Sequence, residues 1–113
     1  MARRDLNVLE AARCAEARVN HLLDRRSGRG LIHSYQLRRS VHAVGTNIAE
    51  AFGRGAGADR SRILRIARGE AEESIEHLHS NLAATRISPK EYWAARNLLA
   101  VVVKMLDVLT DDR

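Results

Sequence analysis

Apolar residues recur every three or four positions in four segments of the chain, a period typical of amphipathic helices. The stripe of the first segment is Val8, Ala12, Ala15, Val19 and Leu22. The other stripes are Leu37, Val41, Val44, Ile48 and Phe52; Ile63/Leu64, Ala67, Ala71, Ile75, Leu78 and Leu82; and Tyr92, Ala95, Leu99, Val102, Leu106 and Leu109. The period predicts an all-α fold with helices over about residues 5–26, 32–53, 59–86 and 89–110.

Glycine and proline separate these segments. Ser27-Gly28-Arg29-Gly30 ends the first helix, and Gly53-Arg54-Gly55-Ala56-Gly57 ends the second. Ser88-Pro89-Lys90-Glu91 reads as a capping box, with Ser at the N-cap, Pro at N1 and Glu at N3. We expect Asp5 to cap the first helix and Asp59 or Ser61 to cap the third. Short connections favour antiparallel neighbours, so we predict one domain, 1–113, folded as an up-down-up-down four-helix bundle.

The last predicted helix is apolar on more than one side. Besides its core stripe it carries a second set, which is Leu98, Val101, Val103, Met105 and Val108. A helix in a four-helix monomer needs a single apolar face, so the surplus predicts self-association through this helix.

Charge is the most informative feature of the composition. The 113 residues hold 19 Lys or Arg against 14 Asp or Glu, a net charge of +5, and the pI is about 10.3. Seventeen of these cations are arginine. Residues 1–68 carry a net +8 and residues 69–113 a net −3. This asymmetry indicates a face presented to a polyanion, and the alternative is a GC-rich genome that favours arginine codons.

Other classes of protein are disfavoured. A single cysteine, Cys14, excludes an internal disulfide and a thiolate metal cage. The chain has no run of about 18 apolar residues that would span a membrane, and its start lacks the apolar core of a secretory signal. We therefore expect a cytoplasmic protein with no membrane contact.

Seven arginines are candidates for contact with nucleic acid, because the planar guanidinium matches two phosphate oxygens. They are Arg38, Arg39, Arg54, Arg60, Arg62, Arg65 and Arg68. Antiparallel helices place Arg3, Arg4, Arg54, Arg60 and Arg62 near one end of the bundle, and Arg25, Arg26, Arg29, Arg38 and Arg39 near the other. The alternative is that Arg54 pairs with Glu50 and the rest are solvated. No aromatic residue interleaves with these arginines, so base stacking is not expected.

Polar residues beside the second stripe are candidates for fixing helix register. Asn47 borders the Val44/Ile48 stripe, whereas Glu50 points away from it. Such residues usually hydrogen-bond a neighbouring helix or subunit, and the alternative is that both contact a partner.

Catalytic and metal chemistry is not expected. Glu76 and His79 form one Glu-x-x-His, whereas di-iron bundles need two such pairs and two further glutamates. The glycine loop lacks a preceding strand and a phosphate-binding lysine. Cys14 has no base partner and is interpreted as a small packing residue. We therefore predict no enzyme, no metal and no cofactor.

Several motifs together resemble a known family. They are Gln36-Leu37-Arg38-Arg39, Val44-Gly45-Thr46-Asn47-Ile48-Ala49-Glu50, Arg65-Ile66-Ala67-Arg68-Gly69 with Glu73, Tyr92, and Met105-Leu106. Over about residues 36–110 the chain is similar to bacterial four-helix-bundle proteins encoded in intervening sequences of 23S rRNA genes. It departs from their pattern at Gly45, Ala51 and Glu70, where they usually have Pro, Gly and Ser.

The resemblance implies a four-helix bundle that assembles as a ring-like homopentamer. It also implies kinship with basic accessory proteins of diversity-generating retroelements, which bind a reverse transcriptase and nucleic acid. We therefore expect a non-enzymatic oligomer whose basic surface binds nucleic acid, in the first place structured RNA. The alternative is a protein-interaction scaffold, such as an accessory subunit of a reverse transcriptase.

Overall fold

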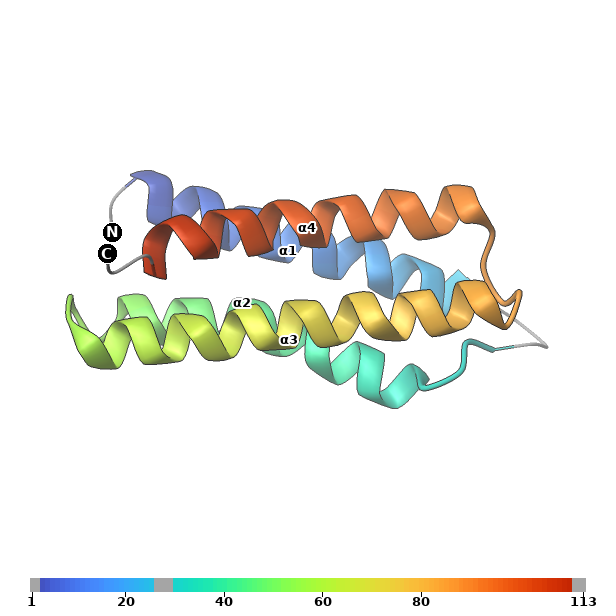
Figure 1. Ribbon diagram of the computed structural model, residues 1–113, viewed down its shortest axis with the longest axis horizontal. Helices are drawn as coiled ribbons and strands as arrows, with labels where there is room; N and C mark the ends of the chain where they lie inside the picture. The colour runs from blue at the N-terminus through green and yellow to red at the C-terminus, as the bar shows by residue number, and fades with distance from the viewer. Residues whose placement is uncertain (1–2, 26–29, 111–113) are drawn as a thin grey trace.

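The computed structural model describes residues 3–25 and 30–110, and every regular element in these ranges is a helix (Figure 1). The helices are α1 (Arg3–Arg25), α2 (Ser34–Phe52), α3 (Ala58–Ala83) and α4 (Pro89–Thr110). The prediction of an all-α, four-helix chain is therefore confirmed. None of the helices, over the residues described, is long and apolar enough to cross a membrane.

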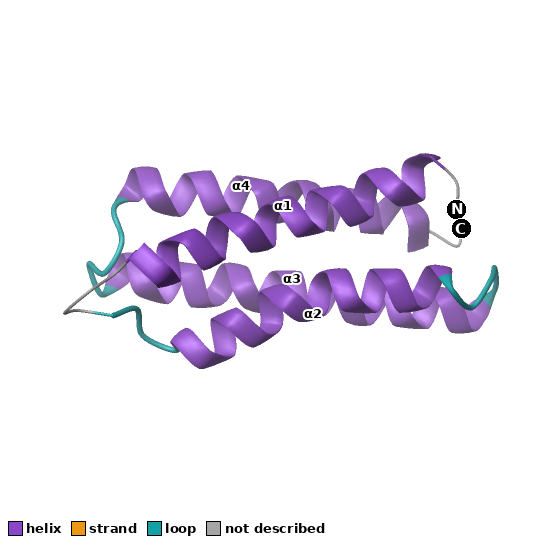
Figure 2. Ribbon diagram, turned by 180° about the vertical axis from the view of Figure 1, so that it is seen from behind, coloured by secondary structure: helices purple, strands orange, loops and turns teal. Residues whose placement is uncertain are grey.

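The helices run alternately up and down along the long axis of the molecule, which measures 46 × 23 × 20 Å (Figures 1 and 2). In the described residues α1 packs against α2 and α4, and α3 packs against the same two helices, whereas the diagonal pairs do not meet. At what we call the proximal end, α1 and α3 begin and α2 and α4 end. At the distal end, α1 and α3 end and α2 and α4 begin.

The predicted stripes form the core. The whole α1 stripe is buried, as are four of the five stripe residues of α2 and five of the six of α4. Phe52, Ile75, Leu82 and Leu109 pack against this core but stay partly exposed. Leu31 and Ile87, from the connecting segments, close the distal end. Burial of this apolar surface is the main source of stability, at roughly 25 cal/mol per Å².

Three fully buried polar side chains interrupt the apolar core, and the stripes did not predict them. Ser40 of α2 and Ser74 of α3 share a hydrogen bond of 2.7 Å. Asn81 of α3 binds the backbone of Ile32. Buried polar groups cost free energy unless they are paired, so these contacts fix how α2 and its leading segment sit on α3.

The helix starts differ in part from the predictions. α1 begins at Arg3, so Asp5 lies inside its first turn and is not the N-cap. The N-cap of α3 is Gly57, whose φ of 130° suits a residue without Cβ, and it makes no side-chain cap. Asp59 instead accepts hydrogen bonds from arginines. The capping box of α4 is confirmed, since Ser88 Oγ accepts from Glu91 N at 3.1 Å and Glu91 Oε1 from Ser88 N at 2.9 Å.

Two connecting segments explain the other shifts in bounds. α2 begins at Ser34 and not at residue 32, because Ile32 is held by Asn81 and His33 has a left-handed φ of 55°. α3 ends at Ala83 and not at residue 86, because Thr85 is also left-handed, with φ 57°. The expected end of the first helix at Arg26 and most of the Ser27–Gly30 break lie outside the described residues.

α2 runs unbroken through Gly45, where the family usually has proline. The glycine gives room to Arg13 of α1, since a Cβ at this position would lie 2.6 Å from Arg13 Nη1. Arg13 in turn pairs with Glu16 at 3.1 Å. Gly45 therefore allows a side chain of α1 to lie directly on the backbone of α2.

The second apolar set of α4 divides between the core and the surface. Leu98, Val103 and Met105 pack against the core, whereas Val101 is 50% and Val108 70% exposed. Trp93, also 50% exposed, lies eight residues before Val101 and so on the same side of the helix. These three exposed residues form what we call the outer face of α4.

Candidate nucleic-acid interface

The arginines predicted at the proximal end are engaged with acidic residues of the chain itself. Arg54 donates to Glu50 and to Asp59, both at 2.9 Å, and Arg62 donates to Asp59 at 2.8 Å. The hydrogen bond from Arg62, followed by that from Arg54, lowers the pKa of Asp59 below its ordinary value of 3.8. The hydrogen bonds to Glu50 and Asp59 raise the pKa of Arg54. The pairing of Arg54 with Glu50 that the sequence offered as an alternative is confirmed.

The remaining candidates on α3 also contact the protein. The guanidinium of Arg60 lies 4.4 Å from the centre of the Phe52 ring. Arg65 donates to the carbonyl oxygen of Thr110 at 3.3 Å. Arg68 pairs with Asp107 at 2.5 Å and with Glu72 at 3.6 Å. These arginines therefore join α3 to its neighbours, and nearby carboxylates offset much of their charge.

Arg38 and Arg39, on the first half of α2, point to opposite sides. Arg38 donates to Asp24 at 2.7 Å and to Asn20 at 3.2 Å, both on α1. Arg39 reaches α3, where it pairs with Glu70 at 3.2 Å and Glu73 at 3.0 Å. Leu37, Val41 and Val44 face the core, and this orientation sets both arginines on the outer surface of α2.

The net positive charge of the chain arises at the distal end. The two sequence segments that lead into and out of that end, residues 18–38 and 76–96, hold eight Lys or Arg and three Asp or Glu. The rest of the chain holds eleven of each. The whole net charge of +5 therefore comes from these two segments, which the fold brings together from opposite ends of the sequence.

A groove between α1 and α4 at the distal end is lined with cations. Arg18, His21 and Arg25 of α1 face Lys90 and Glu91 of α4 around a pocket of about 290 Å³. Arg25 forms an ion pair with Glu91, whose other oxygen belongs to the capping box. Arg18 and Lys90 form no ion pair within residues 7–25 and 30–110. This groove thus offers cations with no acidic partner, which suits an anionic ligand.

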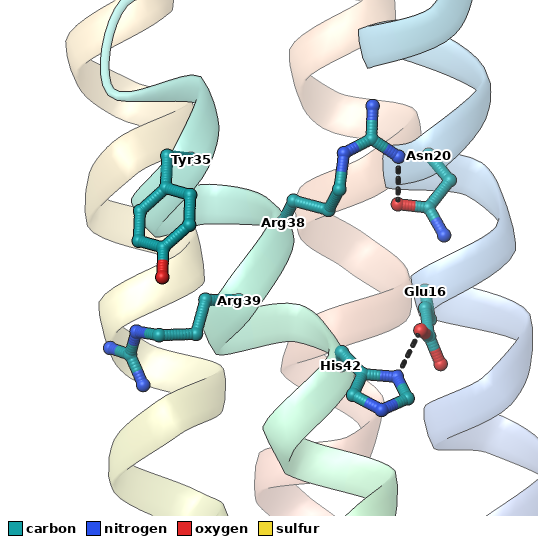
Figure 3. Close-up of a pocket in the computed structure, with 6 residues that line it drawn as sticks. All are labelled: Glu16, Asn20, Tyr35, Arg38, Arg39 and His42. Carbon is teal, nitrogen blue, oxygen red and sulfur yellow. Dashed lines mark hydrogen bonds and ion pairs between the residues drawn. The ribbon is translucent and has the colours of Figure 1, made fainter.

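A second pocket, of about 360 Å³, lies between α1 and α2 (Figure 3). Glu16 and Asn20 of α1 form one wall, and the residues of α2 that line it are Tyr35, Arg38, Arg39 and His42. His42 Nδ1 lies 2.7 Å from Glu16 Oε2. Tyr35 is 76% exposed.

Tyr35 corrects the expectation that no aromatic residue accompanies the arginines. It precedes Arg38 and Arg39 by one helical turn, so the three side chains lie on one face of α2 (Figure 3). The i, i+3, i+4 spacing in the sequence was the signal that could have shown this, but it is apparent only once the outward face of the helix is known.

The residues expected to fix register or assembly lie as follows. Asn47 Nδ2 donates at 2.9 Å to the carbonyl of Ala43 in its own helix, so within the chain it does not bridge two helices. Glu50 is exposed and pairs with Arg54. Leu98 and Met105 are partly buried on α4, and Val101 is on the outer face of α4. Contact of these residues with a second subunit stays a prediction.

Other sites considered in the sequence gain no partners in the structure. Cys14 is exposed, which corrects its interpretation as a packing residue. Its place on α1, between the buried Ala12 and Ala15, turns the side chain outward. Among the described residues there is no group of three or more His, Cys, Asp or Glu side chains that could hold a metal ion.

Comparisons with known proteins agree with this architecture. The family model described as "23S rRNA-intervening sequence protein" matches residues 4–108. The structure is also similar to a crystal structure of a protein of unknown function from the S23 ribosomal protein family of Bacteroides thetaiotaomicron. The two share 24% sequence identity and a TM-score of 0.89, over 96% of this chain and 98% of the other. A search of curated proteins gave no match.

Proposed function

Because the chain belongs to the 23S rRNA-intervening sequence protein family, we propose that it is a non-catalytic protein that binds structured RNA through the distal end of its bundle. The observation that carries the proposal is the location of the net charge, since residues 18–38 and 76–96 account for all of the +5. A local excess of cations attracts the phosphate backbone and releases its condensed counterions.

The arrangement of the cations favours backbone contact over sequence reading. Arg18 and Lys90 line an open groove without an acidic partner in the described chain, and Arg38 is exposed at the edge of α2. No motif that reads base edges in a groove of duplex nucleic acid was found in the sequence. We therefore propose binding to duplex or structured RNA with little preference for sequence.

We also propose that the protein acts as a homo-oligomer, with five subunits as the number that the family resemblance implies. The outer face of α4, with Val101 50% and Val108 70% exposed, supports this proposal because exposed apolar residues on one helix face favour a protein contact. A closed ring would repeat the distal end of each subunit, and several weak contacts to one RNA would then give avidity.

The outer face of α4 equally favours the alternative of a scaffold that binds a different protein, such as a reverse transcriptase. The two functions differ in their dependence on salt. Affinity for RNA should fall linearly with salt on a log–log plot, whereas an apolar protein contact should respond little.

The test is titration of a fluorescent RNA hairpin with the wild-type protein and with two variants that each lose three cations. The distal variant carries Arg18→Gln, Lys90→Gln and Arg96→Gln, and the proximal variant carries Arg60→Gln, Arg62→Gln and Arg65→Gln. We expect the distal variant to bind more weakly and to lose up to about three units of salt slope, roughly one per phosphate contact. Equal effects of the two variants would refute the distal interface, and absence of binding at about 50 mM salt would favour the scaffold.

A further inference from the structure

We propose that the pocket between α1 and α2 holds one unpaired nucleotide of the bound RNA, with its base stacked on Tyr35 and its phosphate on Arg38. This inference rests on the proposed function, because it assigns a specific role to one site near the distal end. It concerns an unstacked base, whereas the cationic groove between α1 and α4 concerns only the phosphate backbone.

Tyr35 has the properties of a stacking platform. Its side chain is 76% exposed, although a tyrosine is costly to leave in water without a purpose for its apolar ring. The ring makes no aromatic or cation–π contact with another described residue. It stands in the first turn of α2, which is anchored because Leu37 is fully buried one turn further on. The ring is therefore both accessible and held on a rigid element.

Arg38 is placed to take the phosphate of the same nucleotide. It lies one turn after Tyr35 and lines the same pocket (Figure 3). Its partner Asp24 is 67% exposed, and ion pairs at such positions contribute little to stability. A phosphate can therefore replace Asp24 at low cost, and the guanidinium would bind two of its oxygens. Asn20, which accepts a hydrogen bond from Arg38 at 3.2 Å, holds the arginine over the pocket in the meantime.

The far wall of the pocket is compatible with an anionic ligand despite Glu16. That carboxylate pairs with Arg13 at 3.1 Å and lies 2.7 Å from His42 Nδ1, so its charge is offset within the protein. The pocket measures about 360 Å³, which is at the small end of the range for ligand pockets. It thus suits one nucleotide, whereas a double helix would rest across its mouth.

The experiment compares two RNA hairpins that differ by one bulged nucleotide, 2-aminopurine, whose fluorescence falls when it stacks. The wild-type protein should bind the bulged hairpin more tightly than the unbulged one and should quench the bulge. Tyr35→Ala should abolish quenching and weaken binding of the bulged hairpin about 5- to 150-fold, the range found for removal of a stacking side chain. Its affinity for the unbulged hairpin should be unchanged.

Two control variants separate stacking from other effects. Tyr35→Phe keeps the ring and should behave as wild type. Trp93→Ala removes another exposed aromatic residue, on α4, and should leave the preference for the bulge intact. Because Tyr35 is mostly exposed, the helicity and melting temperature of Tyr35→Ala should match those of the wild type.

The outcomes distinguish the two proposals. If the wild type binds both hairpins equally, or if Tyr35→Ala keeps the preference and the quenching, the nucleotide pocket is overturned while RNA binding at the distal end stands. If the wild type binds neither hairpin at about 50 mM salt, the proposed function fails and the pocket fails with it.

Discussion

The side chain of Asn81 pairs with both backbone polar groups of Ile32, forty-nine positions earlier in the sequence. Asn81 Oδ1 accepts from Ile32 N at 2.8 Å, and Asn81 Nδ2 donates to Ile32 O at 3.0 Å. The same amide nitrogen donates to His77 O at 2.8 Å, within α3. Asn81 thereby takes the place of a neighbouring backbone for the segment that leads into α2. This segment begins the helix that carries Tyr35 and Arg38.

Replacement of Asn81 by alanine should therefore be costly. Asn81→Ala leaves the N–H and C=O of Ile32 without partners and opens a cavity in a site that is fully buried. We expect the free energy of unfolding to fall by about 2 to 4 kcal/mol, which urea denaturation would measure. The matched control is Asn97→Ala on exposed α4 surface, where the change should be within about 0.5 kcal/mol.

The buried pair of Ser40 and Ser74 should show strong coupling between its two hydroxyl groups. Either single change to alanine leaves one hydroxyl without its 2.7 Å partner, at a cost of about 1 kcal/mol. The double variant removes both polar groups and should be less destabilised than the sum of the single variants. A double-mutant cycle of unfolding free energies measures this coupling, and strictly additive effects would contradict it.

The contribution of Asp59 to stability should depend on pH with a definite sign. Because its pKa is lowered in the folded protein, its ion pairs with Arg62 and Arg54 stabilise the fold above 3.8, the ordinary value of the group. That contribution is lost as the pH falls through the lowered pKa. Asp59→Asn should therefore reduce the melting temperature at neutral pH and match the wild type at about pH 2. A difference that stays constant across this range would show that the charge is not responsible.

The outer face of α4 gives a test of assembly that does not disturb the core. Val101→Glu places a charge on a residue that is 50% exposed, so the monomer should stay folded while an oligomer built on this face dissociates. Light scattering would measure the mass and circular dichroism the helicity. Asn97→Glu, at an exposed polar position of the same helix, is the matched control. A wild-type mass of about 12.6 kDa at micromolar concentration would refute self-association.

Replacement of Leu99 by aspartate provides the contrast for that test. Leu99 is fully buried, so Leu99→Asp would place an unpaired charge in the core. We expect loss of helicity and unfolding, with a penalty of several kcal/mol. If Leu99→Asp and Val101→Glu both kept their helicity, the assignment of the inner and outer sides of α4 would be wrong.

The sequence by itself determined the four helices and most of their inner faces. The period of Leu, Val, Ile and Ala is a local property, because each turn of a helix returns a side chain to the same side. The capping box at Ser88 and Glu91 was likewise predictable, since both partners lie within one turn. The family resemblance was also visible in local motifs, and the match over residues 4–108 bears it out.

Only the tertiary structure decided where the charge lies and which side chains meet. Arg39 and Glu73, or Asn81 and Ile32, are separated by more than thirty positions and come together because antiparallel packing brings distant segments to one place. The sequence divides charge between an N-terminal and a C-terminal part, whereas the fold divides it between two ends. Each end draws on all four helices, so the excess at the distal end and the pocket beside Tyr35 depend on packing that no local pattern encodes.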